Sequence, residues 1–187
     1  DRKDRPLILA VSRSAVPLGR ELADALGSEL ELLPIGRVRL PGEPAPVGAI
    51  DDQGHVCITS SDCHAVTPSL VAHAIQQARA EIDDQMGWGP HAPGSWAGRT
   101  VVVVDDLAAS GAALVVGIRR ARREGATEVV VAVPIASPDA VSRVEREADR
   151  VHALEVSVPT RTDRAPVSDD AVRAALCQGG SRSVQET

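Results

Sequence analysis

The chain has 187 residues, which is the usual size of one domain with a full core, and a formal net charge of −6, which argues against a polyanionic partner. It has no Phe, no Tyr and two Trp, so the aromatic platforms typical of single-strand nucleic-acid binders are lacking. Three cysteines cannot all pair in disulfides, no apolar run is long enough to span a membrane, and the charged start is unlike a signal peptide. We therefore expect a cytoplasmic protein with no nucleic-acid or membrane partner.

The N-terminal part predicts a strand, a turn and a helix. Residues 7–12 form a short apolar run, and the turn at residues 12–15 leads into an apolar-periodic segment. Gly27 follows that segment and is expected to end the helix, because glycine readily adopts the left-handed conformation that helix ends require. A second strand is predicted at residues 30–35.

A loop and a hairpin are expected next. Residues 36–47 are rich in Gly, Pro and Arg without periodicity, and unstructured segments of this length are usually lids or disordered. Residues 47–59 alternate around a central Asp-Asp-Gln-Gly, which is typical of a hairpin. Thr67 and Pro68 form a good helix start, and the helix after them has one apolar face. Residues 85–98 are expected to form a surface excursion.

The stretch from Thr100 to Leu114, TVVVVDDLAASGAAL, is the centre of the interpretation. Four consecutive valines predict a parallel strand covered on both faces. Asp105 and Asp106 follow at its carboxyl end, and a loop of small residues then leads into a helix. Open α/β sheets bind ligands at this edge, and the first NH groups of the helix form an anion site. The acid pair can hold sugar hydroxyls, or a hydrated Mg²⁺ that a phosphorylated ligand brings in.

The rest of the chain continues the alternation of strands and helices. We predict a helix from Ala112 to Gly125 with an outward arginine cluster at residues 119–123, strands at 128–134 and 151–156, a helix after Ser137-Pro138, and a last short helix before residue 176. Such alternation predicts an α/β fold with a doubly wound, mainly parallel sheet and helices on both faces. We expect one domain over residues 1–176 and a frayed tail over 177–187.

Several of these motifs, in this order, resemble type I phosphoribosyltransferases. VVVVDDLAASGAA is similar to the ribose-phosphate signature of that family. ILAVSRSAVPLGRELADALG is similar to the first strand, Pro-Arg-Gly-Gly loop and helix of one predicted bacterial branch, LPGEPAPVGAI to its mobile loop, and REGATEVVVAVPIASPDAV to its next helix end, strand and turn. Relatives usually have a further N-terminal helix, so the chain is expected to be trimmed or short-started.

The resemblance implies transfer from 5-phosphoribosyl 1-diphosphate, with Mg²⁺ as cofactor, to a small-molecule acceptor that we leave unidentified. Asp105 and Asp106 would hold the sugar hydroxyls and, through water and ligand, the metal. Arg13 and Arg37 would act on the leaving diphosphate, since electrostatic help is largest there. The remaining binding residues fall in two loops. The 5-phosphate loop comprises Ala108, Ala109, Ser110, Gly111, Ala112 and Ala113, and the diphosphate loop includes Ser12, Ser14 and Ala15.

The sequence departs from the family pattern at a few of these positions. Ser14 and Ala15 replace two glycines, which would cost energy if the active loop needed backbone angles that glycine alone reaches easily. Ala113 replaces the last loop hydroxyl, a loss of about 1.5–3 kcal/mol for a bond to a charged group. Ala109 replaces the acid of the purine-salvage branch, which disfavours hypoxanthine or guanine as acceptor. A non-aromatic acceptor, or stacking on Trp88 or Trp96, is then expected.

Plainer interpretations stay open beside these. Arg13 and Arg37 could be solvated surface arginines, and the arginine cluster a solvated helix face or an oligomer contact such as a homodimer. Cys57, Cys63 and His64 lack the spacing of a metal site or a proven nucleophile pair, and small buried thiols explain them. Two other functions compete with transfer: a degenerate ribose-phosphate or nucleotide binder acting as regulator or partner subunit, and a hydrolase or cyclase on the same fold.

Overall fold

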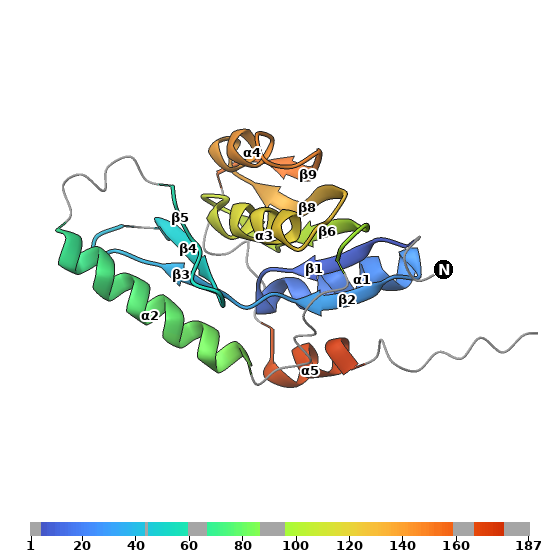
Figure 1. The fold of residues 1–187 in the computed structure, drawn as a ribbon, viewed down its shortest axis with the longest axis horizontal. Coiled ribbons are helices and arrows are strands. Elements are labelled where there is room, and N and C mark those ends of the chain that lie inside the picture. The colour runs from blue at the N-terminus through green and yellow to red at the C-terminus, as the bar shows by residue number, and fades with distance from the viewer. Residues whose placement is uncertain (1–4, 44, 60–66, 87–95, 159–166, 178–187) are drawn as a thin grey trace, which may run out of the picture.

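The computed structural model describes residues 5–43, 45–59, 67–86, 96–158 and 167–177, and its centre is a six-stranded parallel sheet (Figure 1). The strand order is β2-β1-β6-β8-β7, and β9, which lies off this path, also pairs with β8. The strands are β1 (Leu7–Ala10), β2 (Glu29–Leu32), β6 (Thr100–Val104), β7 (Leu107–Ala108), β8 (Glu128–Ala136) and β9 (Arg150–Val156). The doubly wound parallel sheet predicted from the sequence is confirmed.

The four-valine run forms β6, which lies between β1 and β8. Val101 and Val103 are fully buried on one face of the sheet, and Val104 is fully buried in the core of the other face. A strand that packs on both faces needs apolar side chains at successive positions, which explains the continuous run.

Helices cover both faces of this sheet. On one face lie α1 (Val16–Leu26) and α5 (Asp169–Cys177), and on the other lie α3 (Ala112–Arg123) and α4 (Pro138–Val144) (Figure 1). Two predicted boundaries are confirmed: Gly27 ends α1 with φ 59°, and the Ser137 hydroxyl caps α4 by accepting from the Ala140 amide at 3.0 Å. Residues 178–187, where a frayed tail is expected, lie outside the described part of the chain.

A second, antiparallel sheet corrects the prediction of a long loop over residues 36–47. Its strands are β3 (Ile35–Val38), β4 (Gly48–Asp51) and β5 (Val56–Ile58), in the order β3-β4-β5. The β4–β5 hairpin was predicted, but β3 was hidden because Gly36, Arg37 and the nearby prolines look like a loop. Pairing with β4 outweighs this weak local preference for strand.

The small sheet is packed between α2 and α3 (Figure 1). From α2 to α1 the layers are therefore α2, the small sheet, α3, the main sheet and α1. The long helix α2 (Pro68–Met86) covers one face with the apolar side chains predicted for it. A Cβ at Gly36 would lie 1.9 Å from the Ala78 carbonyl oxygen, so glycine lets β3 and α2 approach. The other face packs on α3, which is therefore covered by the small sheet on one side and by the main sheet on the other.

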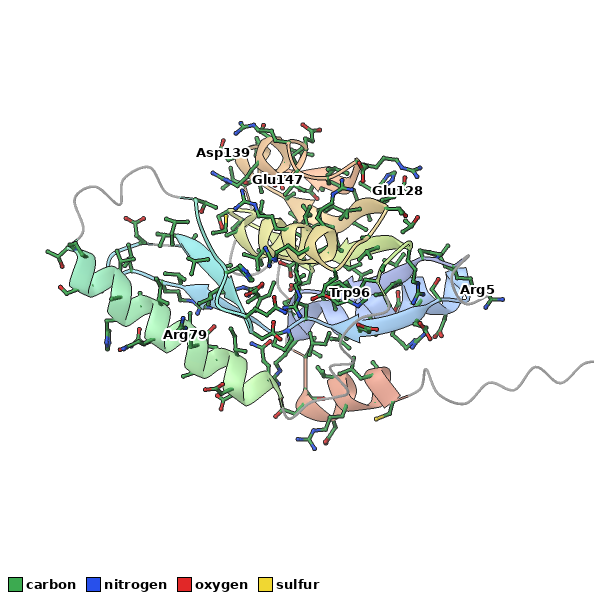
Figure 2. All side chains as sticks on the ribbon, in the orientation of Figure 1. Arg5, Arg79, Trp96, Glu128, Asp139 and Glu147 are labelled. Carbon is green, nitrogen blue, oxygen red and sulfur yellow. The ribbon has the colours of Figure 1, made fainter. Side chains whose placement is uncertain are left out.

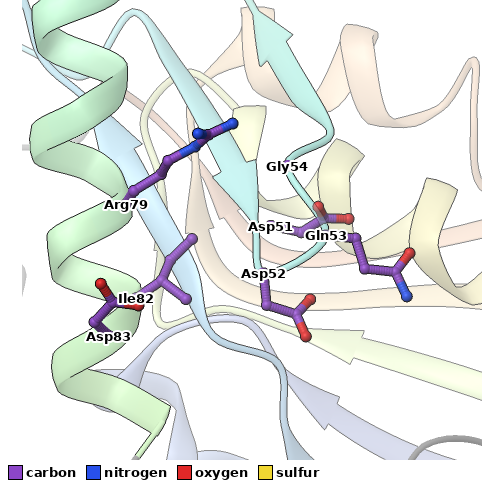
Figure 3. A pocket seen from close by; sticks show the side chains of 7 residues that line it. All are labelled: Asp51, Asp52, Gln53, Gly54, Arg79, Ile82 and Asp83. Atoms are coloured by element: carbon purple, nitrogen blue, oxygen red, sulfur yellow. The ribbon is translucent and has the colours of Figure 1, made fainter.

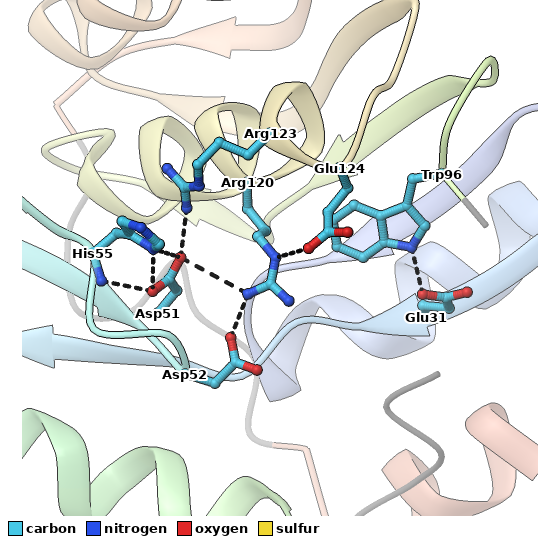
Figure 4. Close-up of polar contacts among 8 residues, drawn as sticks. All are labelled: Glu31, Asp51, Asp52, His55, Trp96, Arg120, Arg123 and Glu124. Atoms are coloured by element: carbon cyan, nitrogen blue, oxygen red, sulfur yellow. Dashed lines mark hydrogen bonds and ion pairs between the residues drawn. The ribbon is translucent and has the colours of Figure 1, made fainter. Parts of the chain in front are cut away.

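Of the arginine cluster of α3, Arg119, Arg122 and Arg123 lie on an exposed face as the sequence suggested, whereas Arg120 is buried. Figure 4 shows Arg120 and Arg123 reaching acids of the β4–β5 turn: Arg120 lies 2.6 Å from Asp52, and Arg123 lies 2.8 Å from Asp51. Asp51 is only 1% exposed. On the other side of α3, Arg119 pairs with Glu147 and Arg122 with Asp149. Ion pairs thus join the small sheet and the segment after α4 to α3.

Trp96 lies in the middle of the molecule, away from the charged residues that are also labelled in Figure 2. It is 4% exposed, its indole NH donates to Glu31 at 2.8 Å, and the Arg120 guanidinium carbon lies 5.7 Å from its ring centroid. Such a distance is typical of a cation–π contact. Among the described helices, none is long and apolar enough to cross a membrane.

Candidate functional site

Asp105 and Asp106 lie directly after β6, at the carboxyl edge of the main sheet. Asp105 is 3% exposed, and Asp106 is half-buried. The Asp106 amide donates to the Asp105 carboxylate at 3.0 Å, which fixes the first acid against the chain. Since β6 is flanked by β1, the acids face the turn that follows β1.

That turn brings two serine hydroxyls onto the acids. After β1, residues Arg13–Ala15 form one 3-10 turn, and α1 continues from it. The Ser12 hydroxyl donates to Asp105 at 2.7 Å, and the Ser14 hydroxyl donates to Asp106 at 2.8 Å. Ser12 also lies 3.2 Å from Asp106 and 3.2 Å from the Ser14 oxygen. The predicted diphosphate loop therefore meets the acid pair through side chains 92 to 94 residues apart in sequence.

The turn itself is unstrained in spite of its two replaced glycines. Ser12 has extended backbone angles, Ala15 has right-handed helical angles, and Ser12 caps the turn by accepting from the Ala15 amide at 3.2 Å. In the described residues, only glycines have positive φ. The energy cost considered for side chains at Ser14 and Ala15 does not arise in this conformation.

Arg37 also reaches the acid pair, although not from a loop. It lies on β3, and its guanidinium is 3.6 Å from the second carboxylate oxygen of Asp105. Its own amide donates to Glu81 of α2 at 3.1 Å. Burial raises the pKa of Asp105 to about 6, and repulsion from Asp106 adds to the rise; the positive charge of Arg37 and the Ser12 hydroxyl act in the opposite direction.

Arg13 contacts a different partner. Its guanidinium is hydrogen-bonded to Asp169, the first residue of α5. The side chain is 38% exposed, and that of Asp169 is 62% exposed. In this state the arginine predicted for the diphosphate is held by the C-terminal helix, while Arg37 is held by the acid pair.

The predicted 5-phosphate loop has the geometry of a tight strand-to-helix turn. Ala108 ends β7, and Gly111 precedes α3 with φ 73°, a left-handed angle that favours glycine. A Cβ at Gly111 would lie 3.2 Å from the Ala140 backbone. The Ser110 hydroxyl accepts from the Ala112 amide at 3.4 Å. The first turn of α3 thus starts at the acid edge, where helix NH groups attract anions.

Two side chains beyond the loop fix its carbonyls. The Ser137 hydroxyl donates to the Ala109 carbonyl at 2.6 Å, and Arg143 of α4 donates to the Ser110 carbonyl. Arg143 also donates to the Thr59 carbonyl at 3.2 Å, so it connects this loop to the small sheet. Ala112 and Ala113 are buried at the start of α3, and Ala109 and Ser110 are half-buried.

Trp96, one of the two expected stacking residues, does not line this site. Trp96 is enclosed by Arg120 and Glu31, so it is not available to stack on an acceptor. Trp88 lies outside the described residues, as do Cys63 and His64 of the weakly supported metal or thiol site. Cys57 is a free, buried thiol on β5, where burial raises its pKa.

A cavity of about 270 Å³ lies elsewhere, between α2 and the β4–β5 turn (Figure 3). The residues that line it are mostly charged or polar: Asp51, Asp52, Gln53, Gly54, Arg79, Ile82 and Asp83. Asp51 and Asp52 already pair with the α3 arginines, so this cavity is a polar gap at the edge of the small sheet.

The acid pair suits a metal ion that is bound partly through water and ligand. Within the described residues, no group of three or more His, Cys, Asp or Glu side chains could ligate an ion directly. Two carboxylates do suit a hydrated Mg²⁺, which prefers oxygen ligands and keeps several waters beside substrate phosphates. The residues present therefore fit a metal that arrives with a phosphorylated ligand.

Some residues of this site had no signal in the sequence. Asp169 lies 156 positions from Arg13, and Arg143 lies 33 from Ser110, so neither contact follows from spacing. The serine contacts could have been anticipated, because parallel neighbouring strands bring their carboxyl ends together and polar residues follow both β1 and β6.

The comparisons with known proteins identify the family of the chain. The family model "Phosphoribosyl transferase domain" matches residues 1–169. Proteins of two Mycobacterium tuberculosis strains, CDC 1551 and H37Rv, each named "Putative phosphoribosyl transferase", are 29% identical over 153 residues. That match covers 79% of this chain and 34% of each relative, so the chain spans about a third of their length.

A solved structure is similar over nearly the whole chain. The crystal structure of TT1426 from Thermus thermophilus is 29% identical and superposes with a TM-score of 0.71, covering 95% of this chain and 89% of that one. Because the family model covers most of the sequence and the acid-pair edge has the matching motif order, the chain belongs to the phosphoribosyl transferase domain family.

Proposed function

We propose that this protein is a cytoplasmic, Mg²⁺-dependent phosphoribosyltransferase that uses 5-phosphoribosyl 1-diphosphate as donor. The observation that carries the proposal is the meeting of three parts at one sheet edge: the Asp105–Asp106 pair after β6, the first turn of α3, and Arg37 from β3. A ribose 5-phosphate has two adjacent hydroxyls, which suit the acid pair, and a phosphate, which suits the first turn of α3.

In this proposal the residues of the β6–α3 segment hold the sugar phosphate. Asp105 and Asp106 accept hydrogen bonds from the ring hydroxyls. The 5-phosphate lies against the loop amides from Ala108 to Ala113, the Ser110 hydroxyl and the positive end of α3. Gly111 supports this role, because its left-handed angle and the lack of a side chain keep the turn tight.

Charge on the departing diphosphate is the main electrostatic problem of the reaction. The bond from the anomeric carbon to the diphosphate oxygen breaks, and the acceptor forms a bond to that carbon while losing a proton to solvent. Arg37 is near enough to the acids to stabilise the diphosphate, and Arg13 would do so after leaving Asp169. Mg²⁺, bound through water and ligand beside Asp105 and Asp106, would neutralise part of the same charge.

The acceptor is proposed to be a small molecule, with no role for nucleic acid or membrane and with a homodimer as the assembly to test. Ala109 argues against a purine-salvage mechanism that needs an acid at that position. The enclosure of Trp96 leaves no described aromatic ring for stacking a flat base and favours a non-aromatic acceptor.

A second candidate is a ribose-phosphate or nucleotide binder that does not transfer. It is favoured by the occupied state of the acids, which accept from Ser12 and Ser14, and by the pairing of Arg13 with Asp169. Hydrolysis or cyclisation on the same fold is a third outcome of the same test.

The test measures pyrophosphate release from 5-phosphoribosyl 1-diphosphate with Mg²⁺, alone and with a panel of small acceptors. Release that requires an acceptor supports transfer, release without one indicates hydrolysis, and binding without release indicates a sensor. The matched variant combines Asp105→Asn and Asp106→Asn, with an unchanged circular dichroism spectrum as the folding control. Unchanged donor affinity of this variant in calorimetry would contradict the site.

A further inference from the structure

We infer that the hydroxyls of Ser12 and Ser14 are an internal substitute for the two ring hydroxyls of the sugar, and that they set the affinity of the acid pair for vicinal diols. This inference rests on the proposed function of the site. It concerns two serines of the first turn, one of which stands where the resembling family has glycine.

The first argument is the stoichiometry of the hydrogen bonds. A serine hydroxyl has one proton to donate. The shortest contacts give the Ser12 proton to Asp105 at 2.7 Å and the Ser14 proton to Asp106 at 2.8 Å. Each carboxylate thus receives one hydroxyl, as it would from each hydroxyl of a vicinal diol.

The second argument is the spacing of the two donors. The serine oxygens lie 3.2 Å from each other, within hydrogen-bond distance, and the Ser12 oxygen is also 3.2 Å from Asp106. Two neighbouring oxygens that face two neighbouring carboxylates reproduce the arrangement of adjacent ring hydroxyls. The sugar and the serines therefore compete for the same acceptor atoms.

The third argument is that the turn is built to hold this arrangement. Ser12 caps the turn through the Ala15 amide, and α1 continues directly after it, so both serines are fixed relative to β1. Hydrogen bonds to a charged group are stronger than neutral ones, and a ligand must replace them before it gains its own. Ser14 is the better probe, because its hydroxyl has no capping role.

The experiment measures binding of ribose 5-phosphate, 2-deoxyribose 5-phosphate and inorganic phosphate by calorimetry. The variants are Ser14→Ala, which removes the hydroxyl alone, and Ser14→Thr, which keeps a hydroxyl. Ser28→Ala is the control, since Ser28 lies beyond the far end of α1 and contacts the Leu26 carbonyl. We expect Ser14→Ala to bind ribose 5-phosphate about tenfold more tightly, the factor that corresponds to one such hydrogen bond.

The other ligands make the result specific. The gain is expected to be smaller for 2-deoxyribose 5-phosphate and absent for inorganic phosphate, because neither presents a vicinal diol to the acids. Ser14→Thr and Ser28→Ala should bind like the wild type. A merely structural role of Ser14 would change all three affinities together and would overturn the inference.

Two further outcomes separate this inference from the function on which it rests. If the wild type binds ribose 5-phosphate and Ser14→Ala binds it equally or more weakly, the competition is refuted while the proposed site stands. If neither protein binds ribose 5-phosphate, the proposed function is refuted and the inference with it.

Discussion

The guanidinium of Arg37 lies 3.6 Å from the carboxylate of Asp105, which joins the small antiparallel sheet to the carboxyl edge of the main sheet. Arg37 comes from β3 and Asp105 from the end of β6, and the two side chains are 16% and 4% exposed. Solvent screens a charge pair only weakly at such low exposure, so the positive charge of Arg37 lowers the pKa of Asp105 against the effect of burial.

Replacing Arg37 with Gln is expected to raise the pKa of Asp105 above about 6, because the positive charge that opposes the effect of burial is removed. Carbon-13 NMR titration of the carboxyl groups measures this. Arg37→Lys keeps the charge and should give a smaller change. Asp106→Asn should lower the pKa of Asp105, since the repulsion from Asp106 disappears. A pKa that stays the same in both the Arg37→Gln and the Asp106→Asn variants would contradict the geometry of the pair.

The raised pKa of Asp105 also predicts how stability depends on pH. The folded state binds a proton at Asp105 more readily than the unfolded state, whose value is 3.8, so the contribution of this group to stability is full below pH 3.8 and is lost as pH rises through about 6. Relative to wild type, Asp105→Asn should therefore gain about 2 kcal/mol between pH 4 and pH 7. Urea unfolding at a series of pH values gives the difference. A constant difference would show that Asp105 ionises normally.

The pairing of Arg120 with the β4–β5 turn should stabilise the protein more than the pairing of Arg122 with Asp149. Arg120→Met removes a positive charge beside the buried Asp51 and beside Asp52, and is expected to cost about 3 kcal/mol. Arg122→Met is the matched control on the same helix, because its pair with Asp149 is exposed and worth about 1 kcal/mol or less. Urea denaturation of both variants measures the costs; equal costs would contradict the role given to Arg120.

Gly36→Ala should separate β3 from α2. The added Cβ would meet the Ala78 carbonyl oxygen at 1.9 Å, a clash with backbone that no rotamer relieves, so a loss of about 3 kcal/mol or more is expected. Gly42→Ala is the control: its φ is 85° and its Cβ would meet nothing within 4 Å, so only backbone strain of about 1–2 kcal/mol is added. Thermal unfolding that ranks Gly42→Ala as the costlier change would contradict the close approach of β3 to α2.

Weakening the contact between Arg13 and α5 should strengthen diphosphate binding. Asp169→Asn removes the charge that holds the Arg13 guanidinium on α5, and an exposed pair is worth about 1 kcal/mol or less, so a gain of up to about fivefold in pyrophosphate affinity is expected. Asp170→Asn, which changes the next residue of α5, is the control for charge alone. Equal affinities of the Asp169→Asn and Asp170→Asn variants in calorimetry would show that the Arg13–Asp169 pair does not compete with the diphosphate.

Much of the architecture followed from local patterns. The valine run predicted β6, the glycine after α1 predicted its end, and Ser137-Pro138 predicted the start of α4, because burial and capping act within a few residues. The acid pair was placed at the right edge for the same reason: a motif that directly follows a buried strand lies where the strand ends.

What the sequence concealed depends on contacts between distant segments. Residues of β3 look like a loop until β4 pairs with them, and the burial of Arg120 within the α3 arginine cluster depends on the small sheet, which brings Asp52 to it. Arg13 lies in the turn after β1, where the sequence predicted a turn, but its partner on α5 could not be read from spacing. The roles of the site residues in binding and transfer stay predictions.

The two-sided cover of α3 has one more consequence. Its first turn begins at the proposed phosphate loop, one flank supports the sheet that ends in the acids, and the other supports the sheet that delivers Arg37. A rotation of α3 would displace the proposed phosphate loop, the acid pair and Arg37 together. Substitutions that adapt the protein to a new substrate should therefore be better tolerated in the connecting segments than along α3, whose position fixes all three parts of the proposed site.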